Sequence, residues 1–209
     1  HADRLVVEPP RTTEPLSVDP GFRFDAAAVF GRTAPLVVEI GAGSGDAVAA
    51  HALAHPEVDH LAIEVWHPGA AQIVSQLAHH GLGNVRVIEV DAARAFATMF
   101  EPGSLAEVWT FFPDPWPKAR HHKRRIIQSG TLNLFASRLK KGGVLHVATD
   151  HAGYAEWIDE LVHVEPSLEY KGWPWPDCPQ LVDRQIITKF EGKGLDKEHI
   201  ITEYLWEKK

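Results

Sequence analysis

The stretch FFPDPWPKARHHKRR, residues 111–125, places a single acid, Asp114, between two prolines and follows it with a dense group of cations. Proline fixes its own φ angle, so Pro113 and Pro115 stiffen the backbone on both sides of the carboxylate. A carboxylate held in this way is suited to a cationic or hydrogen-bond-donating ligand. The purely structural alternative is an Asx turn at Asp114 with Trp116 packed under the loop.

Five lysines and arginines are concentrated in the second half of this stretch: Lys118, Arg120, Lys123, Arg124 and Arg125. The amphipathic run IIQSGTLNLFASRL follows, so we expect the last cations to lie at or near a helix N-terminus. The helix dipole disfavours positive charge there and favours phosphate, so the pattern indicates phosphate binding. A solvated charge run is the alternative. His121 and His122 have no carboxylate or cysteine at ligand spacing nearby, so we expect no metal site.

A glycine-rich turn, VVEIGAGSGDAV, lies between a strand-like run and a helix-like run. Its glycines, Gly41, Gly43 and Gly45, permit a sharp backbone turn and the close approach of a ligand. The dinucleotide fingerprint needs a small residue at the next helical position, where Asp46 would repel a pyrophosphate. This disfavours a nicotinamide-dependent reductase. Glu39 adds negative charge before the turn, which suits a ligand with cationic groups.

Two more acids end the next two strand-like runs. Glu64 is at the position expected to accept hydrogen bonds from ribose hydroxyls, and Asp91 is placed to accept from an adenine amino group. Each acid has a structural alternative: Glu39 as a strand-end charge, Glu64 as a surface acid, Asp91 as a helix N-cap. Three acids at successive strand ends beside a glycine turn favour S-adenosylmethionine, which carries an ammonium and a sulfonium but no phosphate.

Strand-like and helix-like runs alternate from about Leu36 to about Val164. This alternation is typical of βαβ units and predicts an α/β fold with a mostly parallel sheet. In a sheet ordered 3-2-1-4-5, strands 1 and 4 flank the topological switch point, where ligands bind beyond the strand ends. Asp114 follows the fourth strand, so we expect it to face the same pocket as the glycine turn.

The composition limits the class of protein. The 209 residues are 44% hydrophobic and 23% charged, which suits a single globular domain over 36–209, after a loosely ordered arm over 1–35. A net charge of −7 argues against a protein that coats nucleic acid non-specifically. The single cysteine, Cys178, indicates a reducing compartment, and no run is long enough to span a membrane, so we expect a cytoplasmic protein. Monomer and homodimer both stay open.

The segments EIGAGSG, AIEV, DA, FFPDPWPKARHHKRR, VATD and TKFE, in this order, resemble the bacterial tRNA (guanine-N7)-methyltransferases. The resemblance runs from about Leu36 to about Trp206, and PDPWPKARHHKRR is its most specific element. It implies a Rossmann-like class I methyltransferase fold with a seven-stranded sheet and helices on both faces. It also implies methyl transfer from S-adenosylmethionine to N7 of a variable-loop guanine in tRNA.

The resemblance implies roles for individual residues as well. The family's cofactor-binding positions correspond to Glu39, Glu64, Asp91 and Asp114. Asp114 also corresponds to the position that is treated as catalytic in the family. The RNA-binding segment falls on Arg120 to Arg125, and further substrate contacts fall on Lys118, Asp150, Thr188, Lys189, Phe190 and Glu191. Asp150 has a helix N-cap as its alternative, and TKFE has capping-box spacing. Arg184 is not carried over, because the spacing from Arg184 to Thr188 is longer than in the family.

The methyl transfer that the resemblance implies would explain why carboxylates are present at the predicted site. Guanine N7 has an in-plane lone pair and no proton, so the enzyme needs no base, and the methylated purine is cationic. A carboxylate such as Asp114 can hold the guanine edge and stabilise the developing charge. Trp116, Trp173 and Trp175 are candidates to stack on a base taken out of the tRNA. The alternative function is a non-catalytic RNA-binding subunit with a relict cofactor pocket.

Overall fold

The computed structural model describes residues 2–179 and 200–209 of the chain. These residues form a sheet in the order β3-β2-β1-β4-β5-β7-β6. Five neighbouring strands are parallel: β1 (Leu36–Ile40), β2 (Asp59–Ile63), β3 (Val85–Ile88), β4 (Leu105–Phe111) and β5 (Leu139–Thr149). β7 (Thr202–Lys208) is antiparallel to both β5 and β6 (Leu168–Tyr170). The mostly parallel seven-stranded sheet predicted from the sequence is thus confirmed.

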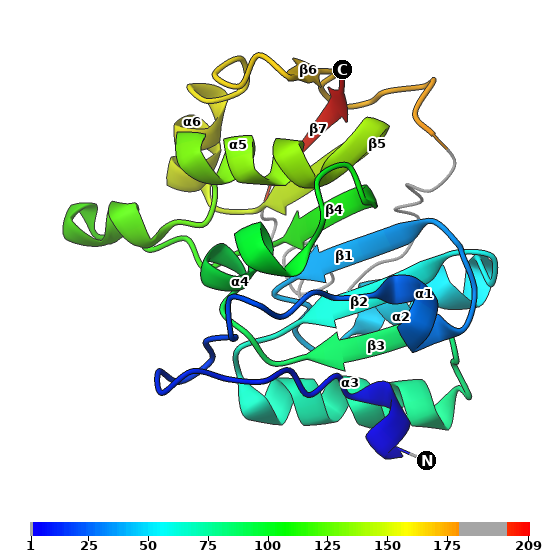
Figure 1. Cartoon of the computed structure of the whole chain (residues 1–209). Helices are drawn as coiled ribbons and strands as arrows, with labels where there is room; N and C mark the ends of the chain where they lie inside the picture. The colour runs from blue at the N-terminus through cyan, green and yellow to red at the C-terminus, as the bar shows by residue number, and fades with distance from the viewer. Residues whose placement is uncertain (1, 180–199) are drawn as a thin grey trace.

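Helices cover both faces of the sheet (Figure 1). One face is covered by α2 (Asp46–Ala54) and α3 (His67–His79), and the other by α1 (Ala26–Phe30), α4 (Ala92–Met99), α5 (Ser129–Arg138) and α6 (Ala152–Asp159). Such two-sided covering explains why the parallel strands are nearly continuous in apolar residues. Among the helices of the described ranges, none is both long and apolar enough to cross a membrane.

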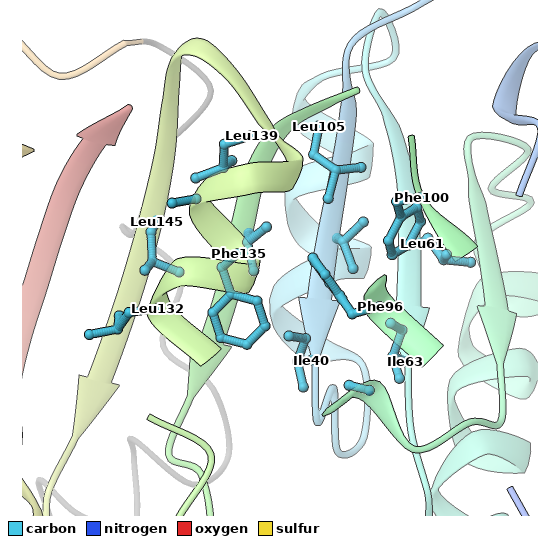
Figure 2. Packing of buried hydrophobic residues seen from close by; sticks show 14 of the residues in the cluster. Ile40, Leu61, Ile63, Phe96, Phe100, Leu105, Leu132, Phe135, Leu139 and Leu145 are labelled. Carbon is cyan, nitrogen blue, oxygen red and sulfur yellow. The ribbon is translucent and has the colours of Figure 1, made fainter. Parts of the chain in front are cut away.

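The larger core lies between the sheet and the α4–α5 side (Figure 2). Phe96 of α4 packs edge to face against Phe135 of α5, with the ring centroids 5.1 Å apart. Ile40 and Ile63, from the carboxyl ends of β1 and β2, belong to the same cluster. The core therefore fixes the helices that follow β3 and β4 against the strand ends that carry the predicted site.

The carboxyl ends of the parallel strands all meet at one edge of the sheet (Figure 1). β1 lies between β2 and β4, so the chain leaves β1 in one direction and reaches β4 from the other, as expected at a topological switch point. A short 3-10 helix, η2 (Ala119–Arg124), lies between β4 and α5.

The basic residues lie farther from α5 than the sequence led us to expect. Most of them are in η2 (Ala119–Arg124), whereas α5 begins only at Ser129. Gln128 is the N-cap of α5 and forms a capping box with Thr131, whose hydroxyl accepts from the Gln128 N–H at 2.9 Å. The run IIQ is consequently a connection between the two helices, and the cations do not sit on the first turn of α5.

Residues 2–25, which belong to the arm predicted over 1–35, contact the β3 edge of the sheet. This segment begins with the 3-10 helix η1 (Ala2–Leu5), and Val6 then forms a parallel bridge with Val87 of β3. Further along, Leu16 accepts a hydrogen bond from the Asp91 N–H at 3.0 Å. All these partners are distant in the chain, which is why composition alone did not indicate the contacts.

Candidate cofactor and nucleic-acid site

The glycine turn follows β1 as predicted and uses the conformational freedom of its glycines. Gly41, Gly43 and Gly45 have φ angles of 70°, 61° and 80°, which residues with a side chain rarely adopt. Gly45 is also closely packed, because a Cβ built there would lie 3.0 Å from two side-chain carbons of Ile73 in α3. This turn therefore requires glycine at Gly45 for two separate reasons.

Asp46, which argued against a pyrophosphate ligand, holds the turn in place. Its carboxylate accepts a hydrogen bond from the Ser44 hydroxyl at 2.8 Å and another from Gln76 Nε2 at 3.2 Å. Because Gln76 lies on α3, the carboxylate ties the start of α2 to a neighbouring helix. The negative charge predicted at this end of the turn is present, and it is committed to local structure.

Glu64 directly follows β2 and is largely buried. One carboxylate oxygen accepts from the Gly43 N–H at 2.8 Å, and the other accepts from the N–H groups of Val65 and Trp66 at 3.0 and 3.1 Å. The carboxylate thus joins the end of β2 to the glycine turn. The surface-acid alternative does not describe this residue.

A cavity of about 560 Å³ lies beside the glycine turn, at the carboxyl ends of the strands. Gly41, Asp91 and Asp114 line it, and so do Lys123 and Arg124. Its apolar walls come from the ends of β1 to β3 and from α5: Ile40, Ile63, Val65, Val90 and Leu134. The volume falls within the range of small-molecule sites, which is roughly 300–1,000 Å³. The cavity therefore brings part of the predicted acid set and part of the predicted basic set to one space.

Asp91 serves as a helix cap and also lines the cavity. Its side chain accepts from the Arg94 N–H at 3.1 Å, which makes it the N-cap of α4. The N-cap alternative weighed for Asp91 is therefore present in the structure. It does not remove Asp91 from the cavity wall, because both features occur together.

Asp114 lies in the connection after β4 and is exposed. Its Oδ1 accepts from the Trp116 N–H at 3.2 Å, which is the Asx turn weighed as the structural alternative. The flanking residues Phe112 and Trp116 have φ angles of 53° and 42°. Such angles cost a residue with a side chain about 1–2 kcal/mol each. The backbone around Asp114 is accordingly bent into a conformation that its own sequence disfavours.

The basic residues in η2 and at its two ends divide into exposed and buried members. Lys118, Arg120, Lys123 and Arg124 are exposed, and the Arg124 guanidinium lies over the Trp116 ring at 5.0 Å from its centroid. Arg125 differs, because it is only 3% exposed. No group of three metal-ligating side chains occurs in the described part of the chain.

Several predicted residues do not line this cavity: Glu39, Gly43, Gly45, Glu64, Lys118, Arg120 and Asp150. Glu39 is buried in β1 on the same face as its neighbour Trp109, whereas the cavity residues Ile40 and Thr110 face the opposite side of the sheet. Asp150 follows β5, and the N-cap of α6 is the next residue, His151, which accepts from the Tyr154 N–H. The cap alternative therefore applies to His151 and not to Asp150.

The remaining predicted residues lie mostly in the C-terminal quarter of the chain. Thr188, Lys189, Phe190 and Glu191 lie outside the described residues, and so does Arg184. Of the candidate stacking residues, Trp116 lines the cavity. Trp173 stacks on His146 of β5 with a centroid distance of 6.0 Å, and Trp175 lies beneath the ammonium of Lys171. The last two rings do not line this cavity.

Three residues that the sequence reasoning missed support the loop before α5. Tyr154 accepts a hydrogen bond from the Ile127 N–H at 3.0 Å, and Trp157 donates to the Ile127 carbonyl at 2.7 Å. Gln128 donates to the carbonyl oxygens of Lys123 and Arg125, both at 2.7 Å. Burial is the main cause that raises the pKa of Tyr154 to about 12. The spacing of YAEW on α6 gave no indication of these contacts.

The fold is shared with solved methyltransferase structures. KamB, a 16S rRNA methyltransferase, aligns with a TM-score of 0.60 at 13% identity, over 84% of this chain and 88% of that chain. Together with the strand order and the cavity beyond the strand ends, this defines a Rossmann-like class I methyltransferase fold.

Comparison with proteins of similar sequence defines a more specific family than the fold does. A family model described as "Putative methyltransferase" matches residues 33–204. The tRNA (guanine-N(7)-)-methyltransferase of Corynebacterium efficiens is 61% identical over 186 residues, which is 88% of this chain and 73% of that protein. The enzyme of the same name from Corynebacterium glutamicum is 58% identical over 185 residues, or 88% and 72% of the two chains. The chain belongs to the tRNA (guanine-N7)-methyltransferase family.

Proposed function

We propose that the chain transfers a methyl group from S-adenosylmethionine to N7 of a guanine in the variable loop of tRNA, with Asp114 as the catalytic carboxylate. The observation that carries this proposal is the cavity shared by Gly41, Asp91, Asp114 and two cations, Lys123 and Arg124. A small cationic cofactor and a polyanionic substrate need opposite charges close together, and this cavity has both. The family to which the chain belongs supplies the reaction and the substrate.

The residues beside the glycine turn fit S-adenosylmethionine. Asp91 and Glu64 are carboxylates at the ends of neighbouring strands, and Ile63, Val65 and Val90 supply apolar wall for a purine ring. Glu64 accepts from three backbone N–H groups, so it is oriented toward the turn. When bound, the cofactor supplies an electrophilic methyl group on a sulfonium. Glu39 belongs to the proposed set through its place just before the turn.

The chain supplies positioning and charge, since the nucleophile needs no deprotonation. Asp114 accepts from the N–H groups on the guanine edge and stabilises the positive charge that develops on the ring. The two flanking prolines and the bent backbone hold the carboxylate at one place, which aligns the nucleophile with the methyl carbon and the leaving sulfur. Asp150, Thr188 and Glu191 are proposed as further substrate contacts.

The exposed cations of η2 bind the tRNA backbone in this proposal. Arg120, Lys123 and Arg124 lie on one short helix that Lys118 precedes, and Lys123 and Arg124 line the cavity, so phosphate oxygens can pair with their guanidinium and ammonium groups. Trp116, which lines the cavity, offers a surface for a base removed from its stack. Lys189 and Phe190 complete the proposed contact set. We place the reaction in the cytoplasm, with a monomer or homodimer as the working species.

The test of this proposal is the Asp114→Asn variant. It keeps the Asx-turn acceptor and removes the charge, so cofactor affinity should stay within about twofold while turnover at saturating tRNA falls at least a hundredfold, or about 2.7 kcal/mol. Calorimetric titration with S-adenosylmethionine measures the first quantity and a single-turnover assay measures the second. Wild-type turnover in Asp114→Asn would remove Asp114 from the chemistry, and a wild-type chain without saturable cofactor binding would favour the relict-pocket alternative.

A further inference from the structure

Arg125 is the exception within the basic stretch. It is 3% exposed, whereas its neighbours Lys123 and Arg124 are exposed. Phosphates of a nucleic acid reach side chains at the surface, and a buried guanidinium is retained in a protein only when it is partnered. The contact with tRNA that the basic run predicted for Arg125 does not fit this burial. Its contacts within the chain indicate what it does instead.

Two aromatic rings of α6 enclose the guanidinium of Arg125. Its central carbon lies 4.9 Å from the ring centroid of Tyr154 and 5.2 Å from that of Trp157. A planar guanidinium stacks on aromatic rings, and the cation–π attraction is stronger when water is excluded. The same two side chains hold the backbone of Ile127 through the hydrogen bonds described above. Helix α6 therefore fixes both the side chain of Arg125 and the backbone that follows it.

Among the described residues, the Arg125 side chain makes one hydrogen bond, and its acceptor lies in the loop that carries Asp114. Arg125 Nε donates to the carbonyl oxygen of Pro115 at 2.8 Å. Pro115 follows Asp114 directly, and its carbonyl belongs to the peptide that joins Pro115 to Trp116, so this contact fixes the turn one residue after the catalytic carboxylate. A hydrogen bond from a charged donor is roughly twice as strong as one between neutral groups. The buried setting strengthens it further.

The loop needs such a contact from outside. Phe112 and Trp116, on the two sides of Asp114, both have positive φ angles, which the local sequence disfavours. At the first of these residues the backbone is held by the bond from the Phe112 N–H to the Ala148 carbonyl at 2.8 Å. The second half of the turn lacks a strand neighbour, and Arg125 supplies its connection to the α6 side of the domain.

We propose that Arg125 is a positioning residue: enclosed by Tyr154 and Trp157, it holds the Pro115 carbonyl and thereby fixes the turn that carries Asp114. The inference rests on the proposed catalytic role of Asp114. Arg125 also lines the cavity, and in this role it belongs to the wall that supports the turn and not to the surface that binds phosphate. The basic stretch thus contains two functions, an exposed set that binds tRNA and one buried arginine that orders the active-site loop.

The main variant is Arg125→Lys, with Arg124→Ala as the matched neighbour. Lysine keeps the charge but loses the planar stack and the Nε donor, so turnover at saturating tRNA should fall at least tenfold. The slope of tRNA binding against salt should stay at the wild-type value. Arg124→Ala, which removes an exposed cation, should lower that slope by about 1. Wild-type turnover in Arg125→Lys, or a slope lowered as in Arg124→Ala, would overturn the inference.

A second variant covers the case in which Arg125→Lys folds poorly. Trp157→Leu removes one face of the enclosure without touching Arg125, and it should lower turnover in the same direction. The two changes should be less than additive, because both release the same turn. Full additivity in the double variant would contradict the proposal. Circular dichroism and thermal unfolding of each variant show whether the fold is retained.

A comparison in the Asp114→Asn background separates this inference from the proposed function. If Arg125 acts through Asp114, adding Arg125→Lys to Asp114→Asn should slow the reaction no further. An additional tenfold loss would mean that Arg125 acts independently, which overturns the inference and leaves the role of Asp114 intact. Wild-type turnover in Asp114→Asn alone is the separate result that would end the proposed role of Asp114.

Discussion

The Glu64 carboxylate accepts a hydrogen bond from the backbone N–H of Gly43 at 2.8 Å, so the end of β2 is tied directly to the glycine turn after β1. The second oxygen of the carboxylate is used by Val65 and Trp66. One side chain therefore sets the shape of the turn, and it is also the acid proposed to bind the ribose of the cofactor. In this proposal, ligand binding and loop order depend on the same acid.

Glu64→Gln should weaken cofactor binding. The amide keeps the shape but has a single acceptor oxygen, and a hydrogen bond to a charged group contributes about 1.5–3 kcal/mol, so the dissociation constant for S-adenosylmethionine should rise tenfold or more. Turnover at saturating cofactor should change less than the affinity does. Isothermal titration measures the affinity, and Glu160→Gln, an exposed acid at the end of α6, is the control. Equal affinities in Glu64→Gln and wild type would contradict the assigned place of Glu64.

Gly45→Ala should destabilise the fold by more than its backbone conformation explains. The φ angle of 80° alone costs alanine about 1–2 kcal/mol. The added methyl group would also lie 3.0 Å from Ile73. Gly81→Ala is the matched control, because Gly81 has a φ of 64° and open space around the new Cβ. Urea unfolding should show a larger loss for Gly45→Ala; equal losses would mean that the contact with Ile73 relaxes freely.

Glu107 should make the protein less stable as the pH rises. It is fully buried in β4, and burial raises its pKa well above the ordinary value. Because the folded-state pKa is the higher one, its contribution to stability is complete below pH 4.5 and is lost as the pH rises toward the folded-state pKa.

Glu107→Gln removes this proton linkage. The variant should gain stability relative to wild type as the pH rises above 4.5, by up to about 1.4 kcal/mol per pH unit. Chemical unfolding at a series of pH values measures the difference. Glu101→Gln, at an exposed position, should show no such trend. A difference between Glu107→Gln and wild type that stays constant over this pH range would show that Glu107 does not take up a proton on folding.

His60 should act in the opposite direction. Burial, together with the nearby His51, which is 2.8 Å away through a ring-to-ring hydrogen bond, lowers its pKa from 6.5 to about 3. The folded-state pKa is the lower one, so its contribution is present above pH 6.5 and is lost as the pH falls toward 3.

His60→Gln should therefore flatten the loss of stability between pH 6.5 and about 4. Each pH unit is worth at most about 1.4 kcal/mol for one proton. The exposed His79 at the end of α3 gives the control His79→Gln. Parallel stability curves for wild type and His60→Gln across this range would rule out His60 as the linked group.

The strand order and the glycine turn were predictable because they depend on local periodicity and on a turn that only glycine makes easily. Because β3 and β4 point the same way in one parallel sheet, Asp91 and Asp114, which follow them, lie at the same edge of the sheet, and they line one cavity. Glu39 shows the limit of this reasoning. Its place at the strand end was clear, but side chains alternate along a strand, and its side chain faces away from Ile40 and the cavity.

Arg125 was unpredictable for a different reason. Arg124 and Arg125 are the same residue type. Which of the two is buried depends on the positions of Tyr154 and Trp157, which lie on the helix after β5. The contacts of the N-terminal segment with β3 depend in the same way on distant residues. Sequence patterns indicate which residue types are gathered in a segment, and tertiary packing decides which of them reach solvent.

The most direct test of the central claim is to incubate the chain with unmodified tRNA and methyl-labelled S-adenosylmethionine and then to locate the label in the RNA. We predict label at N7 of one guanine in the variable loop with the wild-type chain, and a loss of label with Asp114→Asn at matched cofactor occupancy. Label on another atom or base, or no transfer from a chain that binds the cofactor saturably, would contradict it.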